Sequence, residues 1–589
     1  MADSYTGADL FVNALESYGV THVFGNPGTT ELPVMRALAG SDLEYVLALH
    51  EDIAVGMASG YARDRRYHAH EDPSICPLGV ANLHVTPGLA HGLGNLYDAK
   101  ASGAPLLVTA GDHSTGFRHE EPLLSGDLVT IAEEFTKWST EVLDVSALPN
   151  VLRRAVRTAL TPPTGPVFLS LPLDVTLAEI DVETGAEAGT GIETDTETGT
   201  GIGAGIGSGV EPLGPIPDAG RGDPDELDRA ADLLASDGEA VLIVGDGVAR
   251  AGAVDEAVSL AEAAGARVHG EILSAEVNFP ASHDQWVSHV PPNESIARSL
   301  MNADTLAFVG CSTHTTITDH EAPLVGTETT CIHLGDDPAE LGKHYRTDSV
   351  VLGDPGHLMD TLATRVADRL DEGERVDRLE RVREMKESVE ARVEASLSGD
   401  AEESRASKAE LVDAMYEAAP DALVVDESIT SRYPLLSRWP LQAAGFIGHK
   451  GGGLGYGLPA TVGAAIAESQ AGEDDRSRPV LGFIGDGSYL YYPHTLYTAA
   501  RYDLDLTVVV SDNRNYRILK DNFLGMFGGE EADHDFVGMD FDPAVDIPKN
   551  AESHGARGHL IEEREEIVPT LESALDTDGP DVLDVLVHD

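Results

Sequence analysis

Short apolar runs that end in glycine-containing turns and lead into amphipathic helices recur in three segments of the 589-residue chain. This alternation is typical of parallel β-sheets, because each crossover between parallel strands needs a connection long enough to hold a helix. The chain is also longer than one hydrophobic core normally supports. The sequence therefore predicts an α/β fold of three domains, each a parallel sheet covered by helices, at residues 1–180, 223–370 and 408–589.

Two connecting segments separate these domains. Residues 183–209 consist mainly of Gly, Thr and Glu, and they cannot bury enough apolar surface to offset the entropy of ordering. We therefore expect residues 181–222 to form a disordered acidic linker. Its glycines alone could suggest a phosphate-binding loop, but no strand precedes them and no helix follows. Residues 371–407 are charged and have a helical pattern, which predicts a helical connector.

The strongest chemical signal lies in the third segment. An apolar strand leads into GDGS (485–488), and a second apolar strand ends in SDN (511–513). Both turns should lie at the carboxyl edge of one parallel sheet, where open α/β folds bind ligands. Glycines let the backbone approach a diphosphate closely, and a following helix N-terminus favours its charge. Asp486 and Asn513 offer the oxygen ligands that suit Mg²⁺.

The chain contains a second strand-end GDG, at 245–247, that serves as a comparison. Counting 27 positions from Asp486 reaches Asn513, whereas the same count from Asp246 reaches Leu273, which cannot bind a cation. We therefore interpret residues 245–247 as a plain strand-end turn and residues 485–487 as a cofactor motif.

Three motifs, the last of them in two parts, resemble a known family. The GDG motif with its distant Asn, and GGGLGYGLPATVGAAIA (451–467) before it, resemble the cofactor site of thiamine-diphosphate enzymes. VFGNPGTTELP (23–33) and YVLALHEDIAVGMASGYA (45–62) resemble the opening of benzoylformate decarboxylase and its relatives. The resemblance spans the chain apart from the linker. It implies membership of the 2-oxo acid decarboxylase and acetohydroxyacid synthase superfamily, with pyrimidine-binding, Rossmann-like central, and diphosphate- and Mg-binding domains in that order.

In this family a glutamate after the second strand activates the cofactor, and here that residue is Glu51. The resemblance implies that its carboxylate hydrogen-bonds a pyrimidine ring nitrogen and promotes the tautomer that generates the ylide. Taken alone, Glu51 would be an ordinary acid in the first turn of a helix. The three matching motifs on one chain favour the catalytic interpretation.

The resemblance also implies residues that handle protons and substrate. His84 matches the family's Asn-Leu-His segment, and His283 falls where the decarboxylase has its second active-site histidine. Imidazole suits such proton transfers because its pKa lies near neutrality. His50 and His91 are taken as bystanders. Thr29 stands where the decarboxylase has a serine that contacts the substrate carboxylate.

The cofactor and its metal have their own implied residues. The resemblance places Mg²⁺ between Asp486, Asn513 and the backbone carbonyl of Asn515. The other residues implied to contact thiamine diphosphate are Ser428, Thr430, Gly453, Leu454, Gly485, Gly487, Ser488 and Tyr516.

The chain also departs from the family pattern. Gly448, Ile518 and Asn522 fall where benzoylformate decarboxylase has pocket residues around the substrate ring, and Asp512 replaces the first Asn of an Asn-Asn pair. These changes leave cofactor binding intact, but they count against an aromatic substrate.

The expected activity is non-oxidative decarboxylation of a 2-oxo acid by ylide addition, CO₂ loss and protonation of the enamine to an aldehyde. The alternative is an acetohydroxyacid-synthase-like carboligase that joins two carbonyl compounds; the two histidine positions favour protonation. A regulatory protein without catalysis is disfavoured by the intact Glu51, Asp486 and Asn513. GDGVARAG (245–252) does not match the dinucleotide spacing of a dehydrogenase. FAD in the central domain, as in some relatives, is not predicted and stays open.

The charge and composition of the chain limit the kinds of partner it is expected to bind. The chain has 101 Asp and Glu against 39 Lys and Arg, a formal net charge of −62, which excludes binding to a nucleic acid backbone. The acids are spread along the chain, which indicates a halophilic, salt-adapted surface rather than a binding patch. Three scattered cysteines, and the lack of a signal segment or membrane span, predict a cytoplasmic protein. The resemblance implies a homo-oligomer that shares active sites between subunits, at least a dimer and expected to be a tetramer.

Overall fold

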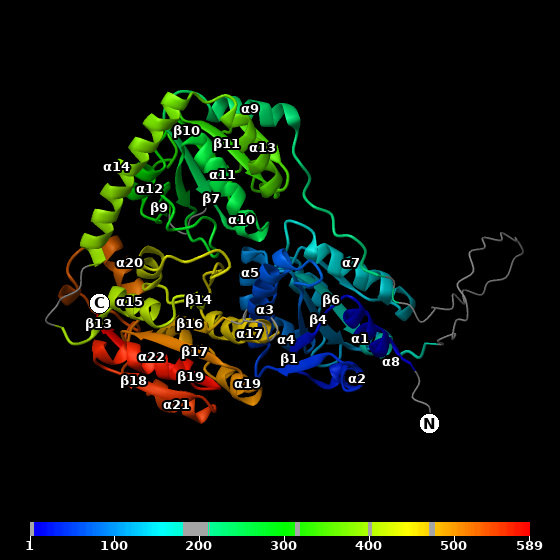
Figure 1. The fold of residues 1–589 in the computed structure, drawn as a ribbon. Helices are drawn as coiled ribbons and strands as arrows, with labels where there is room; N and C mark the ends of the chain where they lie inside the picture. Colours follow the sequence, from blue (N-terminus) through cyan, green and yellow to red (C-terminus); the bar gives the residue numbers. More distant parts are fainter. Residues whose placement is uncertain are drawn as a thin grey trace, which may run out of the picture.

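The computed structural model describes residues 5–180, 210, 212–312, 319–397, 403–470 and 478–588. Within these ranges the strands form three sheets in which every neighbouring pair is parallel, and helices cover the sheets (Figure 1). The predicted α/β fold of three parallel sheets is therefore confirmed. The Gly-, Thr- and Glu-rich stretch 183–209, predicted to be a linker, lies outside the described residues.

The first sheet has six strands in the described chain. Their spatial order is β2 (Glu44–Leu47), β1 (His22–Gly25), β3 (Gly79–Leu83), β4 (Leu106–Asp112), β6 (Val167–Pro172) and β5 (Trp138–Glu141). The strand order reverses at β1, and such a switch point is where open α/β sheets bind ligands. The helices are α1 (Gly7–Ser17), η1 (Thr29–Glu31), α2 (Leu32–Leu38), α3 (Glu51–Glu71), α4 (Val85–His91), α5 (Leu93–Ser102), η2 (Arg118–Glu120), α6 (Leu128–Glu133), η3 (Val145–Ala147), α7 (Leu148–Leu160) and α8 (Leu173–Leu177).

The central sheet also has six strands in the described residues. Their order is β12 (Ser349–Leu352), β11 (Thr330–Gly335), β10 (Thr305–Val309), β7 (Ala240–Val244), β8 (Arg267–Gly270) and β9 (Trp286–His289). The helices are α9 (Pro224–Leu234), α10 (Asp246–Arg250), α11 (Val254–Ala264), α12 (Glu294–Leu300) and α13 (Pro355–Ala367). The long helix α14 (Glu372–Leu397) then runs along the outer edge of the molecule from the central domain to the third (Figure 1).

The third sheet follows the same plan. Its order is β13 (Ala406–Ser407), β19 (Pro580–His588), β17 (Leu506–Asp512), β16 (Val480–Gly485), β14 (Leu423–Glu427) and β15 (Phe446–Gly448), with β18 (Arg557–Ile561) paired to β19. The strand order reverses at β14, which puts the turns after β14 and β16 at a switch point. The helices are α15 (Lys408–Ala418), α16 (Arg432–Arg438), α17 (Gly457–Ser469), α18 (Asp486–Tyr489), α19 (Thr495–Arg501), α20 (Arg517–Phe527), η4 (Glu531–Asp533), α21 (Ile547–Ser553), η5 (Arg564–Glu566) and α22 (Ile567–Leu575).

Helices α3 and α17 bring the first and third domains together. Their backbones approach closely at glycines: a Cβ on Gly60 would lie 2.1 Å from the carbonyl oxygen of Ala460, and one on Gly463 would lie 2.0 Å from that of Met57. The side chains around this crossing belong to one buried apolar cluster that includes residues of both domains. The central domain has its own clusters of buried side chains.

A buried polar seam crosses the same interface. Nε2 of His68 on α3 lies 3.4 Å from Asp64 Oδ2 and 3.4 Å from Glu468 Oε1 on α17. Arg478 pairs with both carboxylates, and its contact with Asp64 is 3.0 Å long. Hydrogen bonds to Asp64 and Glu468 raise the pKa of His68 to about 9. The imidazolium therefore ties the two helices together.

The seam predicts a stability change with pH. The pKa of His68 rises from an ordinary 6.5 to about 9 on folding, so its stabilising effect is full below about 6.5 and is lost as the pH rises through about 9. We expect the thermal midpoint of the wild-type protein to fall across this window, and the His68→Gln variant to lose that dependence. The matched control is His357→Gln, at an exposed position on α13. An equal fall in the His68→Gln variant would show that other groups cause the effect.

Candidate active site

The carboxyl edge of the first sheet brings Glu51 and His84 together. Glu51 is the first residue of α3 and is 7% exposed, and Nδ1 of His91 lies 3.2 Å from its Oε2. A Cβ on Gly88 would lie 2.9 Å from Glu51 Oε1 and 3.3 Å from the Cβ of His84. The helix start that follows β3 therefore packs directly against the predicted activating carboxylate. His91, taken from the sequence as a bystander, contacts Glu51.

Glu31 holds the imidazole of His84, and the sequence analysis missed this residue. Glu31 is buried, and its Oε2 lies 2.7 Å from Nδ1 of His84. Its oxygens also accept hydrogen bonds from the backbone amides of Gly28 and Gly111, each 2.9 Å long. With Nδ1 engaged, Nε2 is the ring nitrogen left for proton transfer. The signal for Glu31 was its position three residues after Gly28 and just before an apolar run, which is a helix-start pattern.

The structure does not bring all four predicted catalytic residues to this edge. Thr29 lies in η1, which follows β1 at this same edge, and its side chain is exposed; the hydroxyl 3.3 Å from Nδ1 of His84 is that of the next residue, Thr30. His283 lies in the central domain, and within this chain it contacts helices α11 and α14. Its Nε2 is 3.4 Å from Glu262 on α11, and its carbonyl oxygen accepts a hydrogen bond from Lys386 on α14. The loop after β8 carries His283 toward these helices.

The turn after β16 holds the predicted metal ligand Asp486. Its Oδ1 accepts a 2.8 Å hydrogen bond from the amide of Gly487, and its Oδ2 is buried without a hydrogen-bond partner. Burial, with the nearby carboxyl of Asp512, raises the pKa of Asp486 to about 8. The same two causes raise the pKa of Asp584 on β19 to about 8. Three buried carboxyl groups therefore crowd together behind this turn.

These groups suit a divalent cation. Asp486 has an unsatisfied buried carboxylate oxygen, and crowded carboxylates become ionised more readily when a cation lies among them. Asn513 follows β17 directly, and its side-chain oxygen accepts a 3.2 Å hydrogen bond from the amide of Asn515. Hard oxygen donors on two adjacent strand ends are the donor set that Mg²⁺ prefers.

The turns around Asp486 also suit a diphosphate. A Cβ on Gly487 would lie 2.6 Å from the ring of Tyr516, so this ring covers the turn. The buried hydroxyl of Ser488 has no hydrogen-bond partner. Gly485 faces the turn after β14, because its Cβ would lie 3.6 Å from the carbonyl oxygen of Ser428. Thr430 is half-buried in that same turn.

The segment before α17 offers open space beside these turns. Gly453 is exposed, and no heavy atom lies within 4 Å of the place where its Cβ would be. Leu454, predicted to support the bent cofactor, is half-buried next to it. The segment can therefore accept a ligand against its backbone without moving a neighbouring side chain.

Unusual backbone conformations flank the predicted residues. Val85, which follows His84, has a φ of +37°, and Ile429, between Ser428 and Thr430, has a φ of +54°. Arg514, between Asn513 and Asn515, has a φ of +59°. Residues other than glycine rarely adopt such angles, least of all β-branched ones, and the strain concentrates at functional sites.

Within the chain, Tyr492 links the first-domain and third-domain groups. Its hydroxyl donates a 3.0 Å hydrogen bond to Asp52, the neighbour of Glu51. Its ring also lies against Gly455, because a Cβ on that glycine would lie 2.7 Å from a ring carbon.

Comparison with protein families matches all three domains in order. Residues 5–143 match the N-terminal TPP binding domain of thiamine pyrophosphate enzymes, residues 227–362 match the central domain, and residues 438–585 match the C-terminal TPP binding domain. The chain belongs to the thiamine pyrophosphate enzymes. This confirms the predicted family, since thiamine pyrophosphate is another name for thiamine diphosphate. Glu51 and His84 lie within the first matched range, and Asp486 and Asn513 lie within the last.

Relatives of this thiamine pyrophosphate enzyme include both decarboxylases and synthases. Benzoylformate decarboxylase of Pseudomonas aeruginosa is 28% identical, with 97% of this chain and 97% of that protein aligned. A probable acetolactate synthase large subunit of Methanocaldococcus jannaschii is 26% identical over 99% of this chain and 92% of its own length. The solved structure of a thiamine diphosphate-dependent 4-hydroxybenzoylformate decarboxylase from Rhodococcus jostii has a TM-score of 0.80 and 27% identity, covering 99% of each chain.

No helix in the described part of this thiamine pyrophosphate enzyme is both long enough and apolar enough to span a lipid bilayer.

Proposed function

We propose that this thiamine pyrophosphate enzyme catalyses the non-oxidative decarboxylation of a 2-oxo acid to an aldehyde. The observation that carries the proposal is the imidazole of His84, fixed by buried Glu31 beside Glu51. Decarboxylation without oxidation needs a proton to replace the departing CO₂, and a positioned histidine is suited to deliver it. The similarity to benzoylformate decarboxylase supports the same reaction class.

The protein's part in the reaction follows from these residues. When bound, thiamine diphosphate supplies the carbon nucleophile and the electron sink for CO₂ loss. Glu51 exchanges a proton with the cofactor's pyrimidine ring from its place at the start of α3. His84 donates from Nε2 the proton that takes the position of CO₂, while Glu31 holds Nδ1. The balance is one 2-oxo acid anion and one proton giving one aldehyde and one CO₂.

Metal binding and the cofactor contacts other than that of Glu51 are assigned to the third domain. Asp486, Asn513 and the carbonyl of Asn515 would hold Mg²⁺, which would neutralise the diphosphate and the crowded carboxylates. The residues assigned to the cofactor itself are Ser428, Thr430, Gly453, Leu454, Gly485, Gly487, Ser488 and Tyr516. We propose no position for His283 relative to the cofactor, because within this chain it contacts Glu262 and Lys386 and not the other site residues.

A homo-oligomer is part of the proposal, because the family resemblance pairs the first domain of one subunit with the third domain of its neighbour. The chain by itself keeps Glu51 at one sheet edge and Asp486 at another. A dimer is the smallest assembly that would complete two such sites, and a tetramer of two dimers is expected. Full activity of a monomer at high dilution would refute this assembly.

The second candidate is a carboligase, favoured by the similarity to acetolactate synthase large subunits. In that reaction a second carbonyl compound, rather than a proton, would react after CO₂ loss. The fixed His84 favours the proton, and for this reason decarboxylation is the primary proposal.

One experiment separates these functions. CO₂ release is measured from a panel of aliphatic and aromatic 2-oxo acids in molar salt with Mg²⁺ and thiamine diphosphate, and the organic product is identified by mass spectrometry. We expect CO₂ together with the simple aldehyde, and the panel then also gives the substrate side chain. CO₂ with a longer hydroxyketone would establish the carboligase, and no CO₂ from any acid would refute both.

A further inference from the structure

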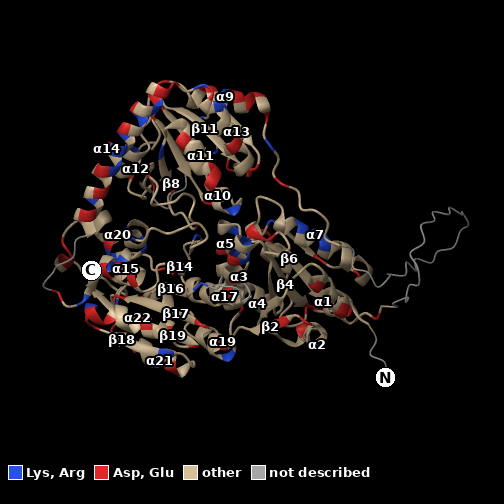
Figure 2. Ribbon diagram, in the orientation of Figure 1, with Lys and Arg blue, Asp and Glu red and all other residues tan. Residues whose placement is uncertain are grey.

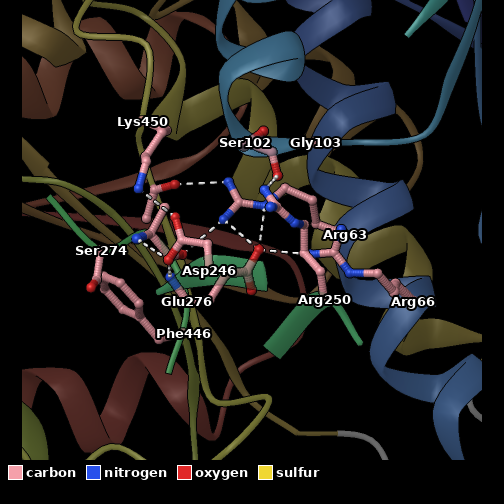
Figure 3. Close-up of polar contacts among 12 residues, drawn as sticks. Arg63, Arg66, Ser102, Gly103, Asp246, Arg250, Ser274, Glu276, Phe446 and Lys450 are labelled. Carbon is pink, nitrogen blue, oxygen red and sulfur yellow. Dashed lines mark hydrogen bonds and ion pairs between the residues drawn. The ribbon is translucent and has the colours of Figure 1, made fainter. Parts of the chain in front are cut away.

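The strand-end turn at 245–247, expected from the sequence to be plain, makes a contact between domains. Nζ of Lys450, in the third domain, lies 2.6 Å from Asp246 Oδ2 and 3.0 Å from Glu271 Oε1 in the central domain. Figure 3 shows the Lys450 side chain pointing at Asp246. The Lys450 side chain is 12% exposed, and those of Asp246 and Glu271 are 3% and 6% exposed. This is a buried charge cluster, although neither the dinucleotide pattern nor the metal pattern predicts it.

Asp246 is itself rigidly held within the central domain. Its Oδ1 accepts hydrogen bonds from the amides of Ala275 and Glu276, at 2.9 and 3.2 Å, and from the side chain of Asn278 at 3.1 Å. The amide of Asp246 donates a 3.0 Å hydrogen bond to Glu271. Burial by itself would lower the pKa of Lys450, but the two carboxylates outweigh burial and raise it. Lys450 is therefore a charged side chain paired with a carboxylate whose own position is fixed by several hydrogen bonds.

Lys450 begins a segment, residues 450–457, whose first backbone amides are held by the first domain. The amides of Lys450 and Gly451 both donate to Oδ1 of Asp98 on α5, at 2.8 and 2.6 Å. Asp98 is buried. All three domains thus meet at two consecutive residues.

The other end of the segment is held within the third domain. Buried Glu427, the last residue of β14, accepts hydrogen bonds from the amides of Gly455 and Gly457, at 2.7 and 2.6 Å. Between these two attachments lie Gly452 and Gly453, exposed and with no heavy atom within 4 Å of their Cβ positions. Gly452 has a φ of +77°, which only glycine adopts readily. The segment has fixed ends and an open middle.

We propose that Lys450 is a positioning residue through which the central domain sets the place of residues 452–454 and thereby the affinity for thiamine diphosphate. A loop ordered before the ligand arrives does not have to be ordered on binding, so its ligand is held more tightly. The inference rests on the proposed cofactor role of Gly453 and Leu454. It assigns to the central domain a part in cofactor binding, although the proposed cofactor contacts all come from the other two domains.

The test is the dissociation constant of thiamine diphosphate, measured by calorimetry with Mg²⁺ in molar salt on the full-length protein. We expect Lys450→Met to raise the Kd roughly tenfold, as is common for residues that support a ligand-binding group from behind. A neutral triple variant, Lys450→Met with Asp246→Asn and Glu271→Gln, avoids leaving buried carboxylates unpaired, and we expect the same rise in Kd.

The matched control is Arg66→Met. Arg66 forms another buried ion pair between domains, 2.6 Å from Glu276, but does not touch the segment (Figure 3). We expect this variant to melt at a lower temperature and to keep the wild-type Kd. Hydrogen exchange gives a second readout: the amides of residues 449–455 should exchange faster in the Lys450→Met protein without cofactor.

Three other results would each contradict the proposal in a different way. If the wild-type protein binds the cofactor and both Lys450 variants bind it equally well, the positioning role is wrong. If Arg66→Met weakens binding as much as Lys450→Met, Lys450 acts only through overall stability, and the proposal fails. If the wild-type protein does not bind thiamine diphosphate at all, the proposed function fails, and this inference fails with it.

Discussion

Replacing Glu51 with glutamine is expected to reduce kcat by roughly a hundredfold to ten-thousandfold, the contribution usual for a positioned acid–base group. Glutamine has nearly the same shape, so the close packing between Glu51 and Gly88 should be preserved. It cannot take up and return a proton, and this loss is the reason for the effect. The measurement is steady-state turnover with saturating thiamine diphosphate and Mg²⁺, with the Kd of the cofactor determined alongside.

The matched control is Glu44→Gln, since Glu44 lies on β2 of the same sheet but is exposed. That variant should turn over like the wild-type protein. A Glu51→Gln protein with full activity would refute the assignment of Glu51. A Glu51→Gln protein that is inactive because it has unfolded would be recognised by its far-ultraviolet circular dichroism.

Salt is expected to have the largest effect on stability. Acidic and basic residues alternate along the outer helix α14, and the chain as a whole has a formal net charge of −62 (Figure 2). Self-repulsion of these charges destabilises the compact state in dilute buffer, whereas about 1 M salt shortens the screening length to roughly 3 Å. We expect the thermal midpoint to rise by about 10 °C or more between low salt and molar KCl, which corresponds to a few kcal/mol for domains of this size.

A charge variant tests whether screening is the cause. Glu384, Glu387 and Glu390 are exposed on α14, and their replacement by lysine reduces the negative charge without touching a core residue. The triple variant should melt at a higher temperature than the wild-type protein in dilute buffer and should gain less from KCl. Equal gains for both proteins would point to a general effect of salt on burial. No gain for the wild-type protein would contradict the salt-adapted surface.

The fold could be predicted from the sequence because its signals are local. Strand-forming apolar runs, the turns after them and the helices between them each occupy short windows, and the regular alternation fixes a parallel sheet. The same reasoning placed Asp486 and Asn513 on neighbouring strand ends, and β16 and β17 are indeed paired in parallel. Resemblance to a family supplied Glu51 and His84, which the structure brings side by side around Gly88.

The remaining features depend on contacts between residues that are far apart in the sequence. Lys450 and Asp246 are separated by 204 positions, and nothing near either residue indicates the other. Glu31 carries a local signal, but that signal describes a helix start and not a contact with His84. His283 stays a prediction, because its position in the chain gives its match to the family but not the path of the long loop after β8, which within this chain carries it to Glu262.

The apolar cluster that joins α3 and α17 has a consequence for how the protein can be divided. Because the first and third domains bury their facing helices in one core, they should open as one cooperative unit, while the central domain keeps cores of its own. A fragment that ends at residue 180 would expose the α3 face to water and would aggregate rather than fold. Exchange of the central domain between relatives is a smaller disturbance, provided that the buried ion pairs at its border are carried over with it. The two ends of the chain, which are synthesised furthest apart in time, therefore form a single folding unit.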